Sequence, residues 1–391
     1  MPRMIEVRGL AVPRLLVLTC LLGLLWGAAA FGQDAPPVKG VLTSIGEGED
    51  MIHVLKVWGT PYEMGYAHGK LCAEKIRGFY MRLTMAMALG MGVDMSLLDN
   101  AWAQMEPFVS DRHKQEMKGL ADGSGIDIKM IQRAHAIPDL SELHCTFFAA
   151  WGSATEDGSL QQIRALDYET RAGIQDEPAL IVQIPDDANA FVNVAWLGFI
   201  GVVTGMNEEK IALSEIGDHF GDDVETLAGE PMPFLMRRVL EQSETLDDAL
   251  AIFRDAKRTS SYLYCVGDAK IPSARKLRTS KAFCDVLGPD DGDMRLPDVV
   301  YWSMGADSVK WNTKVYTALK NKHGRIDPRV GMIDVMRELE TGDLHAVHFD
   351  VAGLELWVAN ATPAPSNAPG YDQNYVHFSF ADALGACRYA E

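Results

Sequence analysis

The chain has 391 residues, of which 48% are hydrophobic and 23% charged, and its 54 acidic residues outnumber its 36 basic ones to give a net charge of −18. This length and apolar content are enough for one large domain or two ordinary domains with a packed core. The negative charge repels a phosphate backbone, so we do not expect nucleic acid as a partner.

The amino end has the pattern of a secretory signal peptide. Three arginines accompany the apolar run 15–26, and the small residues 28–30 follow it. This order predicts a signal peptide over residues 1–32, with cleavage near Ala30 or Gly32, and hence an exported protein, periplasmic or secreted. The run is short for a membrane span, and an uncleaved anchor is the alternative. No later stretch approaches spanning length, so no stable membrane span is expected after cleavage.

Removal of the signal peptide leaves an odd number of cysteines, namely Cys72, Cys145, Cys265, Cys284 and Cys387. In a compartment that permits disulfides, an odd number predicts at least one free thiol. Cys265 and Cys284 either bridge neighbouring strands or remain as two buried thiols. No C-x-x-C pair and no histidine cluster has the spacing of metal ligands, so neither a metal nor another cofactor is expected.

After a proline-containing linker at 35–37, the sequence predicts a strand over 51–58 and then a helix. Thr60-Pro61-Tyr62-Glu63 supplies an N-cap, a proline at the first helical position and a capping-box glutamate. Gly65 and Gly69 lie on one face of this helix, where the missing side chains let another backbone pack closely. Residues 71–135 are expected to be mostly helical, with a break at 119–125.

From Cys145 the pattern changes to strands. The apolar segment 145–152 and the segment 160–168 flank the turn signal Glu156-Asp157-Gly158, which predicts a β-hairpin. Further strands are expected at 179–184, 191–197, 201–204, 211–216, 261–266, 277–286, 345–349 and 354–359. Helices are expected over 234–241, from a cap at Thr245 to 257, and from Asp327-Pro328 to 339. This order predicts an α+β fold in which helices cover stacked antiparallel sheets.

Cys145 is the candidate nucleophile. A hairpin loop of two to four residues places it opposite residues 168–170, so Arg164 and Asp167 lie within a few residues of the thiol. An arginine lowers a thiol pKa from its ordinary value of about 8.5, and a carboxylate orients an amine. Because residues three apart face opposite sides of a strand, both reach the thiol only if 165–166 carries a bulge or the strand ends there. On these residues alone, a buried cysteine with a surface ion pair is the alternative.

Several segments together carry a family resemblance. They are Gly59 to Gly69, Cys145-Thr146, Trp151 to Thr155, Asp157-Gly158, Arg164 to Asp167, Gly205 to Glu208, Gly229-Glu230-Pro231 with Arg237 and Leu240, His345-Ala346-Val347 and Trp357-Val358-Ala359. In this order, across essentially the whole mature chain, they resemble the peptidase C45 family, the acyl-coenzyme A:6-aminopenicillanic acid acyltransferase group. That group is related more distantly to choloylglycine hydrolases and penicillin V acylase.

The resemblance implies a four-layer αββα N-terminal-nucleophile hydrolase sandwich with a helical N-terminal segment. It also implies self-cleavage of the bond between His144 and Cys145, so that 33–144 and 145–391 are the small-chain and large-chain segments of one domain. The freed α-amine of Cys145 would then act as the base for its own thiol. By the same resemblance, Arg164 steadies the thiolate and Asp167 holds the α-amine.

An oxyanion donor is also required, because negative charge develops on the acyl oxygen. Family members place an asparagine in a Thr-Asn-His-like stretch downstream of Asp268, whereas this sequence has Val300-Tyr301-Trp302-Ser303 there and no asparagine until Asn312. Asn207 is a substitute candidate, with a structural turn role as the alternative. Glu215, a carboxylate on an apolar strand, is a candidate pocket residue.

A papain-like Cys–His pair is a different possibility, with His219, His345 or His348 as the partner of Cys145. That kind of nucleophile starts a helix, whereas the run after Cys145 is strand-like, so packing or solvated histidines are the preferred interpretation.

These observations predict an exported C45-like amidase or acyltransferase that acts on a small acylated molecule through a thioester acyl-enzyme. Hydrolysis is favoured over transfer where water is the abundant acceptor. A non-catalytic relative that binds an acyl or lipid-like ligand is the alternative. The missing asparagine gives it mild support, whereas the retention of Cys145, Arg164 and Asp167 argues against it. The acyl group, the leaving group and the oligomeric state are left open.

Overall fold

A computed structural model describes residues 36–90, 92–140, 145–168, 170, 173–218, 225–303 and 308–385. The predicted signal peptide, His144, His219 and Cys387 therefore lie outside the described residues. From Pro37 onward the chain forms one compact unit. In its described part no helix is long and apolar enough to cross a membrane, and no three His, Cys, Asp or Glu residues are grouped so as to hold a metal ion.

The described strands form two sheets. The larger has nine strands, in the order β1 (Gly40–Ile45), β2 (Ile52–Gly59), β5 (Pro178–Pro185), β6 (Phe191–Trp196), β7 (Thr204–Asn207), β8 (Ile211–Gly217), β9 (Tyr262–Asp268), β10 (Ser273–Thr279) and β11 (Cys284–Leu287). The smaller has six, in the order β12 (Val299–Ser303), β3 (Cys145–Ala150), β4 (Gln161–Leu166), β13 (His345–Asp350), β14 (Glu355–Asn360) and β15 (Val376–Ser379). Neighbouring strands are antiparallel except β2 and β5, which are parallel.

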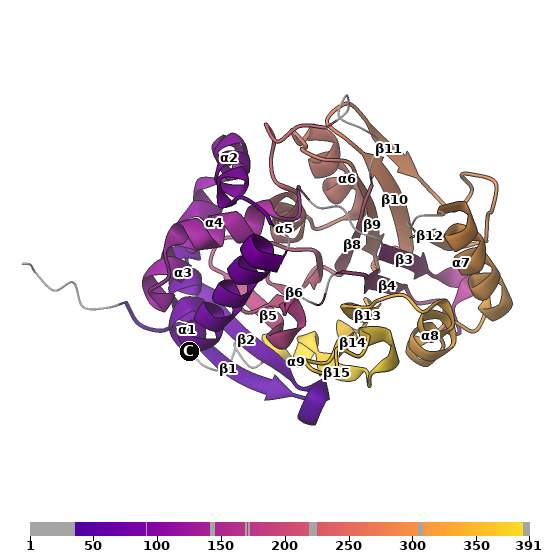
Figure 1. Ribbon diagram of the computed structural model, residues 1–391. Coiled ribbons are helices and arrows are strands. Elements are labelled where there is room, and N and C mark those ends of the chain that lie inside the picture. The colour runs from indigo at the N-terminus through magenta and orange to yellow at the C-terminus, as the bar shows by residue number, and fades with distance from the viewer. Residues whose placement is uncertain are drawn as a thin grey trace, which may run out of the picture. The chain divides into compact units, whose positions relative to one another are not determined.

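Helices cover both sheets. They are α1 (Pro61–Met85), α2 (Met95–Met105), α3 (Asp111–Ser124), α4 (Ile128–Ala136), α5 (Met232–Gln242), α6 (Leu246–Asp255), α7 (Ser308–Lys322), α8 (Arg337–Leu339) and α9 (Phe380–Gly385). Figure 1 shows α1 to α5 on one side of the paired sheets and α7 and α8 on the other. The predicted α+β fold with helices outside two stacked sheets is therefore confirmed.

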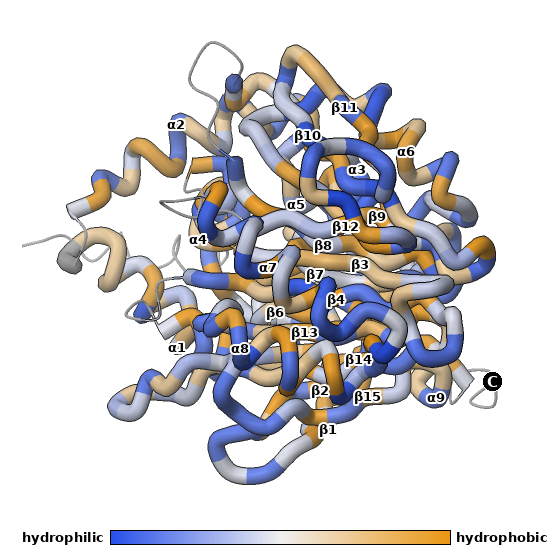
Figure 2. The backbone as a smooth tube through the Cα atoms, turned by 90° about the vertical axis from the view of Figure 1, so that its right-hand side faces the viewer, coloured by the Kyte–Doolittle hydropathy of each residue, from blue (hydrophilic) through white to orange (hydrophobic). Residues whose placement is uncertain are grey.

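Alternate residues of β3 face two different cores. Phe147 packs in the larger core, which includes residues of both sheets, whereas Phe148 packs with Val315 and Leu319 of α7 in a second core. Figure 2 shows the central strands largely in hydrophobic colours and more of the hydrophilic colour on the surrounding loops. A strand that is buried on both faces is apolar at successive positions, which explains the unbroken apolar run that marked β3 in the sequence.

The capping signals predict their helices correctly. Thr60 and Glu63 form the expected capping box at the start of α1, and Thr245 and Asp248 form another at the start of α6. In each box a side chain satisfies a backbone N–H that the helix leaves without a partner. The Asp327-Pro328 signal is followed by a π-helical segment, Val330–Met336, which runs into α8.

The predicted helix break at 119–125 is correct only at its last residue. Helix α3 continues through Gly119 and Gly123 to Ser124, and only Gly125, with φ of 71°, ends it. A Cβ on either glycine would collide with the backbone of α1, at Tyr62 and Tyr66 respectively, while Gly65 and Gly69 of α1 lie against the backbone of α3. Close contact of two helices requires small residues on both, so these glycines pack the helices together rather than interrupt one.

Two predicted strands differ from the structure. The strand expected over 277–286 is a hairpin, β10 and β11, and the strand expected at 201–204 is shifted to β7. Strands β1, β12 and β15 were not predicted at all. Cys265 is opposite Lys276 and Cys284 is opposite Thr279, on either side of β10, so the possible bridge between these cysteines is absent and both are free.

Candidate active site

The β3–β4 hairpin brings Cys145 and Arg164 to one face of the smaller sheet. Cys145 is opposite Leu166 and Phe147 is opposite Arg164, and paired residues of an antiparallel ladder share a face. The predicted register, with Cys145 opposite 168–170, is wrong because the connection spans residues 151–160. The turn signal at Asp157-Gly158 lies inside this longer loop, which is anchored where Ser153 donates two hydrogen bonds to Asp298.

The Cys145 thiol is buried beside a cation. Cys145 is 2% exposed. Arg164 Nη2 lies 3.5 Å from its Sγ, and the backbone N–H of Asp167 also donates to the sulfur. Burial raises the pKa of Cys145 to about 12, even though Arg164 opposes that rise. The thiol is therefore protonated at neutral pH and requires a base before it can act as a nucleophile.

Arg164 is fully buried and connects three strands. Its Nη2 donates to Oε1 of Glu215 on β8, and its Nη1 lies 3.3 Å from Nε2 of His345 on β13. Burial raises the pKa of Glu215, while the guanidinium of Arg164 opposes that rise. The pair neutralises two charges inside the protein, and this is the arrangement that makes buried charges tolerable.

His345 is held as a neutral acceptor. Its Nε2 faces Arg164 Nη1 and, at 3.5 Å, the Thr204 hydroxyl, while its ring stacks on Trp196. Burial, with Arg164 nearby, lowers the pKa of His345 well below its ordinary value. A histidine whose Nε2 already accepts from an arginine cannot take the proton of a thiol, which argues against a papain-like pair.

His348, the other described candidate for such a pair, lies on the other face of the sheet, because it is opposite Ile163, which packs with Phe148 in the second core. Its Nε2 lies 2.6 Å from Oε1 of Gln161, and burial lowers its pKa to about 3.

Asp167 follows the last residue of β4, so its side chain is not confined to the face of Arg164. Its carboxylate accepts from the Thr341 hydroxyl at 2.8 Å and from the backbone N–H groups of Gly342 and Asp343 at 2.5 and 2.9 Å. Of the two conditions stated for Arg164 and Asp167 to reach one thiol, the structure meets the second, since the strand ends at Leu166.

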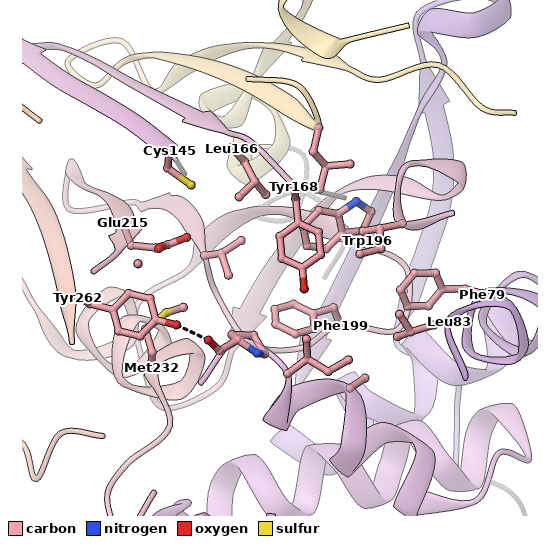
Figure 3. A pocket seen from close by; sticks show the side chains of 17 residues that line it. Phe79, Leu83, Cys145, Leu166, Tyr168, Trp196, Phe199, Glu215, Met232 and Tyr262 are labelled. Atoms are coloured by element: carbon pink, nitrogen blue, oxygen red, sulfur yellow. Dashed lines mark hydrogen bonds between the residues drawn. The ribbon is translucent and has the colours of Figure 1, made fainter. Parts of the chain in front are cut away.

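An apolar pocket begins at Cys145. It encloses about 730 Å³, open solvent included. Cys145 and Glu215 lie together at one end of the view in Figure 3, while Phe79 and Leu83 of α1 lie at the other, with Phe199 and Trp196 between them. Residues before position 145 and residues after it both line the pocket. Ligand sites in proteins are mostly apolar with few polar groups, as this pocket is.

Glu215 lines this pocket, as expected, whereas Asn207 does not. The Asn207 amide donates to the carbonyls of Leu240 and Ser243, and its Oδ1 accepts from the Ile211 N–H, so all its groups are used in joining β7 to the end of α5. These contacts favour the structural alternative for Asn207. Asn312 likewise serves the backbone, by accepting from the N–H of Ser303 and donating to its carbonyl.

Sequence reasoning missed the Thr341–Asp343 loop and the pocket walls from α1. Phe79 and Leu83 are four residues apart, so helical periodicity indicates that they share a face. No local signal indicates what that face contacts. The loop carries a weak signal in Gly342, whose φ of 102° is a conformation that favours glycine.

Comparison with known proteins gives distant relatives. No family model matches the chain. Protein dcd1B of Dictyostelium discoideum is 27% identical over 398 aligned positions, covering 88% of this chain and 77% of the relative. Protein dcd1A of the same organism is 26% identical, covering 86% and 87%. Among solved structures, the Caenorhabditis elegans N-acylethanolamine-hydrolyzing acid amidase ortholog is 15% identical with a TM-score of 0.43, covering 59% of this chain and 99% of that chain.

Proposed function

We propose that this protein is an exported, self-processing cysteine amidase of the peptidase C45 kind, with Cys145 as its nucleophile. One observation carries the proposal: Cys145 is the first residue of a central strand, and its thiol lies between a buried Arg164–Glu215 pair and an apolar pocket. A nucleophile, a cation beside it and an apolar cavity are three of the elements that acyl transfer uses.

Self-processing would begin at the bond between residues 144 and 145. The Cys145 sulfur attacks the carbonyl carbon of residue 144, a C–S bond forms, the C–N bond breaks, and the thiol proton passes to the released amine. Water then attacks the thioester, the C–S bond breaks, and a carboxyl group and the free thiol result. The new α-amine lies on the nucleophile itself, where an ordinary pKa of about 8 lets it accept a proton at neutral pH.

The same chemistry would then act on substrate. The α-amine takes the thiol proton, the sulfur forms a thioester with the substrate acyl group, and the amine of the broken amide leaves with a proton. Water, or another acceptor in the case of an acyltransferase, releases the acyl group. The high pKa of the Cys145 thiol supports the need for such a base, since His345 and Glu215 are both paired with Arg164.

The pocket favours an apolar acyl group. Its walls include Phe79, Leu83, Phe199 and Trp196, and a long or aromatic acyl chain would remove apolar surface from water there. The polar group at its Cys145 end, Glu215, is neutralised by Arg164, so the scissile amide is expected at that end and the acyl chain toward α1.

Expression of residues 33–391 with and without Cys145→Ala tests the proposal. The unaltered chain is expected to give two fragments, the larger one beginning Cys145-Thr146-Phe147, and to hydrolyse a panel of N-acyl amides. C145A is expected to stay uncut and inactive. Cys284→Ala removes another free thiol, half-buried on β11, and should process normally. An intact chain that still turns over amides would contradict self-processing.

Acyl binding without turnover is the second candidate. No asparagine lies among the described residues that line the pocket, and burial keeps the Cys145 thiol protonated. An unprocessed chain that binds fatty amides with the same affinity in the C145A variant would establish this second candidate.

Export is tested by expressing the full chain and sequencing the mature amino terminus, which is expected to follow Ala30 or Gly32.

A further inference from the structure

The loop after α8 forms a three-donor cradle around Asp167. The Thr341 hydroxyl and the N–H groups of Gly342 and Asp343 all donate to the carboxylate, at distances from 2.5 to 2.9 Å. Thr341 is 3% exposed. The backbone at Gly342 has φ of 102°, and a side chain there would meet Ala346, so glycine lets consecutive N–H groups converge on one anion.

The cradle opposes the effect of burial on the charge of Asp167. Burial raises the pKa of this carboxyl group, and the three donors oppose burial because hydrogen bonds to a carboxylate favour its ionised form. Other titratable and charged groups face Asp167 from the segments around it: Arg164 of β4, Cys145 of β3, Asp343 of the loop itself and Tyr371 of the turn Gly370–Asp372.

A line of buried hydroxyls extends the cradle to β12. Thr341 Oγ1 lies 3.1 Å from Thr146 Oγ1, which lies 2.7 Å from Ser303 Oγ. A hydroxyl has one proton to donate. The Thr341 hydroxyl shares its proton between the Asp167 carboxylate and Thr146 Oγ1, and either hydroxyl of the Thr146–Ser303 pair can be the donor.

This line reaches the strand that carries the nucleophile. Thr146 follows Cys145 directly, and the backbone N–H of Asp167 donates to the Cys145 sulfur. A carboxylate on this residue is close enough to the nucleophile to accept from an α-amine freed at Cys145. The line therefore ties the position of Asp167 to the position of Cys145 through side chains that touch neither the thiol nor the pocket.

We propose that Thr341 is a positioning residue for the reaction, which keeps the Asp167 carboxylate ionised and turned toward the α-amine of Cys145. This inference rests on the proposed function. Thr341 acts through Asp167 and does not contact the reacting atoms. Without its hydroxyl, the carboxylate loses its side-chain donor and retains only the two backbone N–H groups.

The test compares Thr341→Val, which removes the hydroxyl at nearly constant shape, with Thr341→Ser, which keeps it. Thr317→Val is the matched control, because Thr317 is exposed and its hydroxyl donates to the Thr313 carbonyl of its own helix. Aspartate carboxyl ¹³C NMR, assigned with Asp167→Asn, follows the titration of Asp167 whether or not the protein is active. The kcat/KM of the processed protein on N-acyl amides is measured across pH.

In T341V we expect Asp167 to titrate at higher pH, and kcat/KM to fall about tenfold on the acidic side of its profile, the usual cost of one hydrogen bond to a charged group. T341S and T317V should match the unaltered protein. An unchanged Asp167 titration in T341V overturns the inference, whatever its activity. If T341V does not fold, Thr341→Ala is measured in the same way. If the proposed function itself is wrong, the unaltered chain will neither process itself nor turn over amides, so the two failures can be told apart.

Discussion

Arg164 Nη2 lies 3.5 Å from Cys145 Sγ and donates to Glu215 from the same buried position. Arg164→Met removes the counter-charge of Glu215, and breaking a buried pair in this way typically costs about 3–5 kcal/mol. We expect R164M to lower the midpoint of urea unfolding strongly and to abolish processing. Arg329→Met, which alters an exposed pair with Asp334, should change the midpoint little. Equal effects of the two substitutions would contradict the assigned burial of Arg164.

Burial of Cys145 makes a prediction about its reactivity. Because its pKa is raised to about 12, the thiol of the uncut chain is expected to react slowly with iodoacetamide at pH 7 and steadily faster as the pH rises toward 12. In the processed chain the adjacent α-amine should accelerate the reaction near neutral pH. Peptide mass spectrometry measures both rates, with the buried Cys72 as internal reference. Equal rates at pH 7 before and after processing would argue against the α-amine as base.

The crossing of α1 and α3 leaves no room for a side chain at Gly65. A Cβ there would collide with the Glu116 carbonyl oxygen, so Gly65→Ala is expected to lower the free energy of unfolding by about 1–3 kcal/mol. Gly78→Ala is the control on the same helix, where the nearest atom is the flexible end of Arg82. That substitution should stabilise by about 0.5–1 kcal/mol, because alanine is the better helix former. Thermal unfolding of both variants distinguishes helix propensity from helix contact.

His68 and His135 predict a loss of stability in acid. Each accepts a backbone N–H through Nε2, from Gly198 and Ile200 respectively, so each must be neutral there. Burial lowers the pKa of His68 to about 3 and of His135 to about 4, whereas the unfolded chain takes up these protons near 6.5. Between those values the unfolded state binds more protons, so the free energy of unfolding falls as pH drops from about 6.5 to 4.

Melting temperatures measured across that pH range check this prediction. His68→Gln keeps an acceptor that does not titrate and should make the acid slope shallower. His377→Gln, at an exposed position, is the control and should leave the slope unchanged. A melting temperature that stays constant from pH 6.5 to 4 would show that these two histidines do not govern acid stability.

Leu83 should limit the length of the acyl chain. It lies at the end of the pocket far from Cys145, so Leu83→Trp is expected to reduce kcat/KM at least about tenfold for long acyl amides while leaving short ones near normal. Met81→Trp, on the exposed side of the same helix, provides the control. The readout is kcat/KM against acyl length. A uniform loss for all lengths in L83W would place the acyl chain elsewhere.

Features that depend on near neighbours were predictable from the amino-acid sequence alone. The capping boxes at Thr60 and Thr245 mark their helices, because each is completed within four residues. The β3–β4 hairpin, and with it the proximity of Arg164 to Cys145, follows from two apolar runs around a turn signal. Its register was not predictable, since the loop between the runs is anchored by Asp298, far along the chain.

The rest was decided by contacts between distant segments. Glu215 and His345 meet Arg164 only because β8 faces β4 across the two sheets and β13 pairs with β4. The sequence around Asn207 indicates only a turn, and the hydrogen-bond partner at the end of α5 is evident only in the folded chain. Gly119 indicates a helix break in the sequence, whereas in the structure it allows close packing against α1. Local propensity describes what a segment can form, whereas burial and pairing depend on which surfaces the whole chain brings together, and so only the tertiary structure determined them.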